Sequence, residues 1–359
     1  MGFYSTDIYK SDLEEISDNI VNCELLKNKN ILVTGANGLI ASYIVDTFLW
    51  LNENRDFNIH IYALARSRSK IESRFEEHLN NQNFHIILQS VTEPITSINY
   101  RFDYVIHAAC SAHPLAYSTA PVEIIKSNIV GTENLLNYMI SHDGGKLLFV
   151  SSSEVYGENK NIEKIGEDDY GYINIINPRS CYSESKRAAE TLCASYAKEY
   201  GIESCYVRPG FIFGAAITDD NSRADAQFLR NVIKGEDIVM KSPGLQLRSY
   251  EYVSDAVSAI LTVLINGENM NAYNIASSIS SATIREFAEL IASEGGTRVI
   301  FENPDEVEKA GYSVISRCIL DSQKIESLGW KPSVTIREGV KRMLNITKEI
   351  GSMEKIPDK

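Results

Sequence analysis

The sequence predicts an α/β protein built on a doubly wound parallel sheet, followed by a smaller mixed α/β cap. Apolar runs rich in β-branched residues alternate with helical segments between residues 30 and 210, a pattern typical of βαβ units. The runs are almost continuously apolar, as expected for strands that are covered on both faces. Shorter segments follow, so residues 211–359 are assigned mainly to the C-terminal cap, and some of them return to the sheet.

The individual elements follow from these patterns. An amphipathic helix over 7–25 precedes the first strand, so residues 1–28 form an N-terminal helical extension and the sheet unit covers 29–210. Strands are predicted at 30–35, 58–65, 84–89, 103–109, 146–152 and 204–210. Helices are predicted at 38–51, 69–79, 120–141 and 180–200 in the sheet unit, and at 224–235, 253–264, 283–293 and 335–347 in the cap.

The composition argues against several classes of protein. The 359 residues include 35 basic and 48 acidic side chains, a formal charge of −13, which disfavours nucleic-acid binding because phosphate contacts need clustered Lys and Arg. No apolar run reaches the ~18 residues of a membrane span, and acids stand where a signal peptide has its apolar core. A cytoplasmic protein is therefore expected. The cysteines and histidines show no metal-ligand spacing, so no metal site is expected.

The first predicted strand runs into a glycine turn, TGANGLIA at 34–41. Between a strand and a helix, such a turn lets backbone N–H groups approach a pyrophosphate, and the helix N-terminus adds partial positive charge. Ala41 stands where the fingerprint has its last glycine, a position that requires only a small side chain. The sequence therefore predicts a Rossmann-type dinucleotide site over Gly35, Asn37, Gly38, Leu39 and Ile40.

The end of the second predicted strand leaves the choice of dinucleotide open. NAD-binding units usually carry Asp or Glu there for the ribose 2′-hydroxyl, whereas this chain has Ala65-Arg66-Ser67-Arg68. Arg66 could hold the 2′-phosphate of NADP, or it could be a solvated arginine that begins the next helix. From these residues alone NADP is slightly favoured.

Two later segments carry a candidate acid–base site. Ser152 ends the fifth strand, and Tyr182 and Lys186 are four residues apart, on one face of a predicted helix. A neighbouring ammonium is expected to lower the tyrosine pKa, so that Tyr182 takes a proton from a sugar hydroxyl while nicotinamide accepts the hydride. The Tyr-x-x-x-Lys spacing is common on amphipathic helices, but its order after a glycine turn and a strand-end serine is specific.

In this order the motifs resemble those of extended short-chain dehydrogenases/reductases of the NAD-dependent epimerase/dehydratase family. The resemblance covers about residues 29–345, through TGANGLIA, DYVIHAA, SSSEVYG, YSESK, SYEYVSDAV and LGWKP. It implies a nucleotide-sugar substrate, transient oxidation at sugar carbon 4, bound NAD, with NADP as the alternative, and often a homodimer. The expected cofactor contacts are Gly35, Asn37, Gly38, Leu39, Ile40, Arg66, Ser90, Val91, Ala108, Tyr182 and Lys186.

Within the family, the motif after the fifth strand distinguishes the reactions. In sugar 4,6-dehydratases it resembles Thr-Asp-Glu, whereas Ser152-Ser153-Glu154 lacks the acid for the leaving hydroxyl. The pattern is similar to that of UDP-glucuronate decarboxylases, as are the segments 107–132 and 177–191. The resemblance therefore implies decarboxylation, with Ser152, Glu154, Tyr182 and Lys186 as catalytic residues. Arg317 lies one residue off the position of an arginine that those enzymes use in decarboxylation.

The chemistry of such a decarboxylation assigns a role to each group. Oxidation at carbon 4 turns a uronate into a β-keto acid, so carbon dioxide can leave as an enolate forms. Tyr182 and Ser152 would stabilise the oxyanion, and Glu154 and Arg317 would meet the carboxylate end. Glu154 could instead only hydrogen-bond the following turn, and Arg317 could bind a phosphate or form a surface ion pair.

Other functions stay open. A nucleotide-sugar 4-epimerase would need Ser152, Tyr182 and Lys186 without Glu154, and a cofactor-sensing protein without catalysis would be expected to have lost the Tyr/Lys pair. Phe211 stands where many members of the resembling family have Asn near the substrate diphosphate, and Ala215-Ala216 stand where they usually have Pro-Arg. These differences leave the identity of the substrate undetermined. The candidate substrate-binding residues are Ser111, Arg223, Arg248 and Arg317, with Arg223 and Arg248 expected at the diphosphate.

Overall fold

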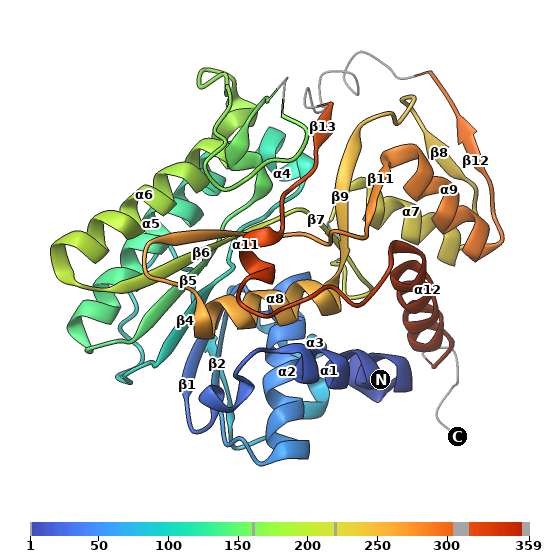
Figure 1. The fold of residues 1–359 in the computed structure, drawn as a ribbon. Coiled ribbons are helices and arrows are strands. Elements are labelled where there is room, and N and C mark those ends of the chain that lie inside the picture. The colour runs from blue at the N-terminus through green and yellow to red at the C-terminus, as the bar shows by residue number, and fades with distance from the viewer. Residues whose placement is uncertain (1, 160–161, 219–220, 304–315, 354–359) are drawn as a thin grey trace.

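The computed structural model describes residues 2–159, 162–218, 221–303 and 316–353. In this part of the chain seven parallel strands form the main sheet, in the order β10-β6-β5-β4-β1-β2-β3 (Figure 1). The predicted doubly wound α/β fold is therefore confirmed. The strands are β1 (Asn30–Thr34), β2 (His60–Ala65), β3 (Phe84–Leu88), β4 (Tyr104–His107), β5 (Lys146–Val150), β6 (Glu203–Pro209) and β10 (Asn271–Ile275).

The strand order reverses between β1 and β4. The chain builds outward from β1 to β3, then crosses back to place β4 on the other side of β1. Connections at this point leave the sheet in opposite directions, which opens a crevice at the carboxyl ends of β1 and β4. Doubly wound sheets bind their ligands at such a crevice.

Alternating side chains of the strands pack on opposite faces of the sheet. In β1, Ile31 and Val33 join the cluster that contains α2 (Leu39–Arg55) and α8 (Val253–Asn266). Leu32 points the other way, into a cluster with α5 (Pro121–Ser141) and α6 (Cys181–Tyr200). Both faces are covered (Figure 1), which explains why the strands read as continuous apolar runs.

The N-terminal helix is shorter than the sequence pattern predicts. It is α1 (Asp7–Asn19), and its N-cap Thr6 accepts a hydrogen bond from the Tyr9 N–H at 3.3 Å. Ile20 is extended, and the Val21 N–H donates to Thr262 of α8 instead of continuing the helix. The predicted helix at 69–79 also divides. The remaining short elements near the N-terminus are η1 (Phe3–Ser5), η2 (Cys23–Leu26), α3 (Arg68–Arg74) and η3 (Glu76–His78).

A smaller mixed α/β unit lies beside the carboxyl ends of the main sheet, at the upper right in Figure 1. It begins with β7 after residue 210, whereas α8 and β10 return to the main sheet. Its elements are β7 (Phe211–Phe213), α7 (Ala224–Ile233), β8 (Ile238–Met240), β9 (Leu247–Tyr252), β11 (Ser281–Thr283), α9 (Ile284–Gly295), β12 (Val299–Phe301), β13 (Arg317–Cys318) and α12 (Ile336–Met353).

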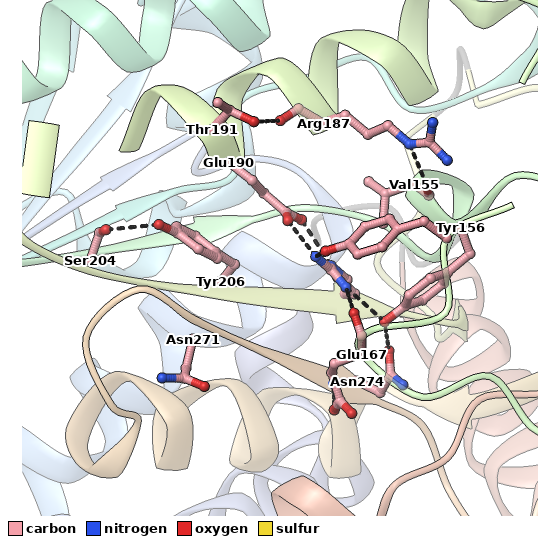
Figure 2. A network of polar contacts seen from close by, with 12 residues as sticks. Val155, Tyr156, Glu167, Arg187, Glu190, Thr191, Ser204, Tyr206, Asn271 and Asn274 are labelled. Atoms are coloured by element: carbon pink, nitrogen blue, oxygen red, sulfur yellow. Dashed lines mark hydrogen bonds and ion pairs between the residues drawn. The ribbon is translucent and has the colours of Figure 1, made fainter. Parts of the chain in front are cut away.

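A buried network of hydrogen bonds and an ion pair connects the segments next to β5 (Figure 2). Arg208 of β6 donates to both carboxylate oxygens of Glu190 in α6, at 3.0 and 2.6 Å. The same guanidinium donates to the Tyr156 hydroxyl and to the Glu167 carbonyl, and Tyr156 donates to Asn274 of β10. The network therefore joins β6, α6, β10 and the turn after β5.

Four short helices complete the main unit and its contacts with the cap. They are α4 (Pro114–Thr119), η4 (Ser153–Tyr156), η5 (Pro178–Ser180) and α11 (Gln323–Glu326). Across the described ranges, no helix combines the length and the apolar character needed to cross a bilayer.

Candidate active site

A cavity of about 1670 Å³ lies at the carboxyl ends of the main strands. Its walls come from both units, because the turns after β1, β2, β4 and β5 line one part and residues of β7, α7 and β9 line another. This is the crevice that the strand order creates. Nearly all residues that the sequence analysis proposed for the site line this cavity.

The glycine turn forms the floor of one end of the cavity. Gly35 has a φ of +68°, and a Cβ at this position would lie 2.7 Å from the Ala109 Cα at the end of β4. Gly38 occupies the N-cap of α2 and has no side chain to accept from the first N–H groups of the helix. Asn37, Leu39 and Ile40 line the same wall. The close backbone and the open helix N-terminus fit the pyrophosphate of a dinucleotide.

The neighbouring strand ends supply the rest of this wall. Arg66 follows β2, is exposed to solvent and lines the cavity. Ser90 and Val91 follow β3 and also line it, as does Ala108 after β4. The Ser90 hydroxyl is hydrogen-bonded to the Thr92 hydroxyl at 2.8 Å. Arg66 therefore stands where an acidic residue would meet the ribose, within reach of the wall that fits the cofactor.

The three residues proposed for acid–base chemistry meet in the same cavity. Tyr182 and Lys186 lie one turn apart on α6, where they are 6% and 3% exposed. The Lys186 Nζ donates to the Val150 carbonyl at 2.6 Å, which anchors the lysine beneath the end of β5. Ser152 follows β5, and its Oγ accepts from the Glu154 N–H at 3.2 Å. This arrangement places a phenol, an ammonium and a hydroxyl together at the carboxyl end of β5, inside the cavity.

The expected direction of the Tyr182 pKa is wrong for the protein environment described here. Burial is the largest influence and raises the pKa of Tyr182, and the neighbouring Cys110 raises it further. A hydrogen bond with the Ser152 side chain acts in the opposite direction. Burial also lowers the pKa of Lys186. The Lys186 Nζ lies 5.8 Å from the centre of the Tyr182 ring and is bonded to the Val150 carbonyl, and its charge is not among the main influences on the Tyr182 pKa.

Glu154 forms a bidentate ion pair that the sequence pattern does not predict. Both Nη atoms of Arg179 donate to the Glu154 carboxylate, each at 2.8 Å. Arg179 belongs to η5, directly before α6, and both side chains line the cavity. Burial acts to lower the pKa of Arg179, but the hydrogen bonds and charge of Glu154, with smaller contributions from its neighbours, raise the pKa overall. Glu154 therefore does more than hydrogen-bond its own turn.

Tyr117 of α4 completes this corner of the cavity. Its ring stacks on the Tyr182 ring, with the centroids 4.9 Å apart and the planes at 25°. The Arg179 guanidinium lies over the Tyr117 ring, 4.5 Å from its centroid. Arg179, Tyr117 and Tyr182 thus form a layered stack beside Glu154. The sequence signal that could have revealed it is an arginine three residues before the tyrosine, within the segment 177–191 that resembles the decarboxylases.

Three of the four candidate substrate residues line the cavity, and the fourth does not. Ser111, Arg223 and Arg248 line the cavity. Arg223 pairs with Asp225 at 3.2 Å, and Arg248, buried in β9, lies over the Phe211 ring. Burial lowers the pKa of Arg248.

Arg317 is the exception among the proposed substrate residues. It is exposed in β13, its Nε donates to the Glu163 carbonyl at 3.0 Å, and it is not among the described residues that line the cavity. The expected contact with a substrate carboxylate is therefore corrected. In this register of β13 beside β9, Cys318 is buried against the main body and the arginine side chain points outward.

Comparison with known proteins places these features in one family. A family model described as "NAD dependent epimerase/dehydratase family" matches residues 31–276. The chain belongs to this family. The family resemblance drawn from the sequence motifs is therefore confirmed.

Curated members of the epimerase/dehydratase family are similar over most of the chain. UDP-glucuronic acid decarboxylase 6 of Arabidopsis thaliana is 32% identical over 320 residues, which are 88% of each protein. UDP-glucuronic acid decarboxylase 1 of Danio rerio is 30% identical over 88% of this chain and 72% of its own length.

Two solved structures have the same fold as this chain. UDP-glucose 4-epimerase of Thermotoga maritima, with UDP-glucose, has a TM-score of 0.76 and 26% identity over 90% of this chain and 99% of its own. A dTDP-glucose 4,6-dehydratase of Streptomyces venezuelae, with NAD bound, has a TM-score of 0.77 at 21% identity over 90% and 98% of the two chains. The second likeness concerns the fold alone.

Proposed function

We propose that this protein is an NAD-dependent nucleotide-sugar decarboxylase that acts on UDP-glucuronate or a closely related nucleotide uronate. The observation that carries the proposal is the similarity to UDP-glucuronic acid decarboxylases over 88% of both chains, together with a paired glutamate, Glu154, beside Ser152 and Tyr182 in the cavity. A dinucleotide held over the glycine turn and beside Arg66 would supply hydride acceptance and return.

The residues of the chain carry the proton chemistry. Tyr182 would accept the proton of the sugar 4-hydroxyl, while Ser152 would hydrogen-bond the same oxygen. When the bond from carbon 5 to the carboxylate breaks, carbon dioxide leaves and the electron pair moves onto that oxygen as an enolate, which the phenol and serine hydroxyls are placed to stabilise. Carbon 5 would then take a proton from water, and hydride would return to carbon 4. Lys186, fixed by the Val150 carbonyl, would favour the deprotonated tyrosine. Glu154 would act at the carboxylate end of the sugar, without Arg317.

The diphosphate of the substrate needs positive charge at the other side of the sugar. Arg223 and Arg248 line that part of the cavity, and guanidinium groups match phosphate oxygens in geometry and charge. We propose that these two arginines hold the diphosphate, and that Ser111 contacts the substrate.

The test is mass spectrometry of the products formed from UDP-, GDP-, CDP- and dTDP-linked sugars, uronates included. We expect a nucleotide uronate to lose carbon dioxide while the total amount of NAD is unchanged. Loss of water instead would indicate dehydration and would overturn the proposal.

A 4-epimerase is the second candidate, because the UDP-glucose 4-epimerase of Thermotoga maritima has the same fold at 26% identity and Ser152, Tyr182 and Lys186 suffice for that reaction. A product of unchanged mass, formed at full rate by Glu154→Gln, would favour the epimerase.

We further propose that the protein forms a homodimer in the cytoplasm. On α5, which packs beside α6, Val122 and Ile125 remain 59% and 40% exposed, and apolar residues on one helix face favour a second copy. Light scattering at micromolar concentration would measure the dimer, and Val122→Glu is expected to weaken it. A monomer would contradict the proposal.

A further inference from the structure

The corner of the cavity at Glu154 poses an electrostatic problem for an anionic sugar. Ser152 and Tyr182 mark the place of sugar carbon 4, and Glu154 lies two residues after Ser152 in the same turn. A uronate bears its carboxylate on carbon 5, next to carbon 4. An unpaired Glu154 would therefore repel the substrate group that it is proposed to serve, because like charges at short distance disfavour each other.

Arg179 removes this repulsion. Its guanidinium binds both oxygens of Glu154 at 2.8 Å, so the pair presents no net charge to the cavity. A guanidinium has five N–H donors, and the two bonds to Glu154 leave three. The Arg179 side chain is 38% exposed and lines the cavity. It can therefore hold Glu154 and meet a second carboxylate at the same time.

The position of Arg179 is fixed from several sides. The Asn177 side chain accepts from the Arg179 N–H at 3.0 Å, and Pro178 restricts the backbone between them. The guanidinium lies over Tyr117, which in turn stacks on Tyr182. Ordering a long side chain in advance lowers the entropy lost when a ligand binds. The stack also ties the place of the guanidinium to that of Tyr182.

The other cations near Tyr182 are used differently. Lys186 is buried and donates to the Val150 carbonyl. Arg223 pairs with Asp225 and donates to the Ile212 carbonyl. Arg248 of β9 lies over the Phe211 ring of β7, on the side proposed for the diphosphate. Arg317 does not line the cavity.

We propose that Arg179 is the residue that selects an anionic sugar, because it neutralises Glu154 and offers its remaining N–H groups to the sugar carboxylate. This inference deepens the proposed function and rests on it for the choice of a uronate. It assigns the recognition of the carboxylate to the segment before α6, in place of Arg317.

The experiment measures binding by calorimetry, so that it does not depend on turnover. UDP-glucuronate and UDP-glucose are compared in a Tyr182→Phe background, which slows conversion, with NAD present. Arg179→Met is expected to weaken UDP-glucuronate binding by about 10- to 100-fold, the scale of losing hydrogen bonds to a charged group. UDP-glucose should change by less than about threefold, and Arg179→Lys should recover part of the loss.

Arg285→Met is the matched control. Arg285 also pairs with a glutamate, Glu289 at 2.8 Å, and also lies over an aromatic ring, that of Phe301 at 5.0 Å. It is half-exposed on α9, and its side chain does not line the cavity. Neither ligand should lose affinity in this variant.

The outcomes separate the inference from the proposed function. Equal losses for both ligands in Arg179→Met, or no loss, would overturn the role of Arg179. Release of carbon dioxide from UDP-glucuronate by the unmodified enzyme is measured separately. If no nucleotide uronate loses carbon dioxide while Arg179→Met still weakens UDP-glucuronate binding and leaves UDP-glucose binding unchanged, the proposed function fails and the carboxylate site stands.

Discussion

Two arginine–glutamate pairs lie at or beside α6, the helix that carries Tyr182 and Lys186, and they differ in what surrounds them. Arg208 and Glu190 have side chains that are 2% and 10% exposed, whereas those of Arg179 and Glu154 are 38% and 26% exposed. Both arginines grip both carboxylate oxygens. The ion-pair chemistry is the same, so the difference lies in the remaining N–H groups.

The buried arginine, Arg208, uses its other N–H groups for hydrogen bonds within the protein. Arg208 also donates to the Tyr156 hydroxyl, the Glu167 carbonyl and the Tyr170 hydroxyl, as buried charges require. Arg179 lines the cavity, and within the described ranges its guanidinium makes no hydrogen bond besides the two to Glu154. The comparison teaches that a saturated pair holds the fold, and that a pair with spare donors facing a cavity is available for a ligand.

The largest effect is expected on the cavity side, from Tyr182→Phe. Loss of the phenol hydroxyl removes the acid–base group, and turnover should fall by about 10²–10⁴-fold. The fold should not depend on this hydroxyl, so the melting temperature should stay within a few degrees. Steady-state kinetics and thermal unfolding measure the two quantities. Near-normal turnover would refute the assignment of Tyr182.

The opposite pattern is expected for Arg208→Met. Removing one partner leaves Glu190 buried without its cation, which costs about 3–5 kcal/mol of unfolding free energy. Urea denaturation should show this loss, with the surface variant Arg285→Met as a control that changes little. A loss below about 1 kcal/mol would contradict this distinction, because the buried pair would then contribute no more to the free energy of unfolding than an exposed ion pair does.

A buried glutamate without an arginine sharpens the comparison. Glu251 of β9 is fully buried, neither of its carboxylate oxygens has a hydrogen-bond partner within the described ranges, and burial with the nearby Asp255 raises its pKa. Above the ordinary glutamate pKa the unfolded chain loses this proton while the folded chain keeps it. Stability should therefore fall as the pH rises from about 4.5, by at most about 1.4 kcal/mol per pH unit.

The variant Glu251→Gln tests this sign. The variant lacks the Glu251 carboxyl, so its unfolding free energy should not show the fall that this group causes. The difference in unfolding free energy between variant and unmodified protein should therefore grow in favour of the variant from pH 5 to pH 8. Denaturant unfolding at a series of pH values measures the difference. Parallel pH profiles for the two proteins would show that Glu251 does not carry the effect.

The smallest effect is expected for Arg66→Ala at the cofactor end. Arg66 is exposed after β2, where a single charge contributes little in water, so NAD affinity should change by less than about threefold. Titration of cofactor-free protein with NAD and NADP measures the preference. A strong preference for NADP that disappears in Arg66→Ala would instead assign this arginine to a 2′-phosphate.

Local sequence patterns determined the fold class and the residues Ser152, Tyr182 and Lys186 that line the centre of the candidate site. Apolar runs and helical periods are properties of neighbouring residues, so the alternating strands and helices could be predicted. The glycine turn was also visible, because its function requires a strand directly before it and a helix directly after it. Tyr182 and Lys186 could be paired because four residues make about one helical turn.

Only the tertiary structure decided how distant residues meet. Arg179 and Glu154 are 25 positions apart and come from two different short helices, and no periodicity relates them. The register of β13 beside β9 directed Arg317 away from the cavity. The direction of the Tyr182 pKa depends on burial beneath elements from across the chain. Charge pairing and desolvation are set by what packs around a group, and local sequence carries no direct record of that packing.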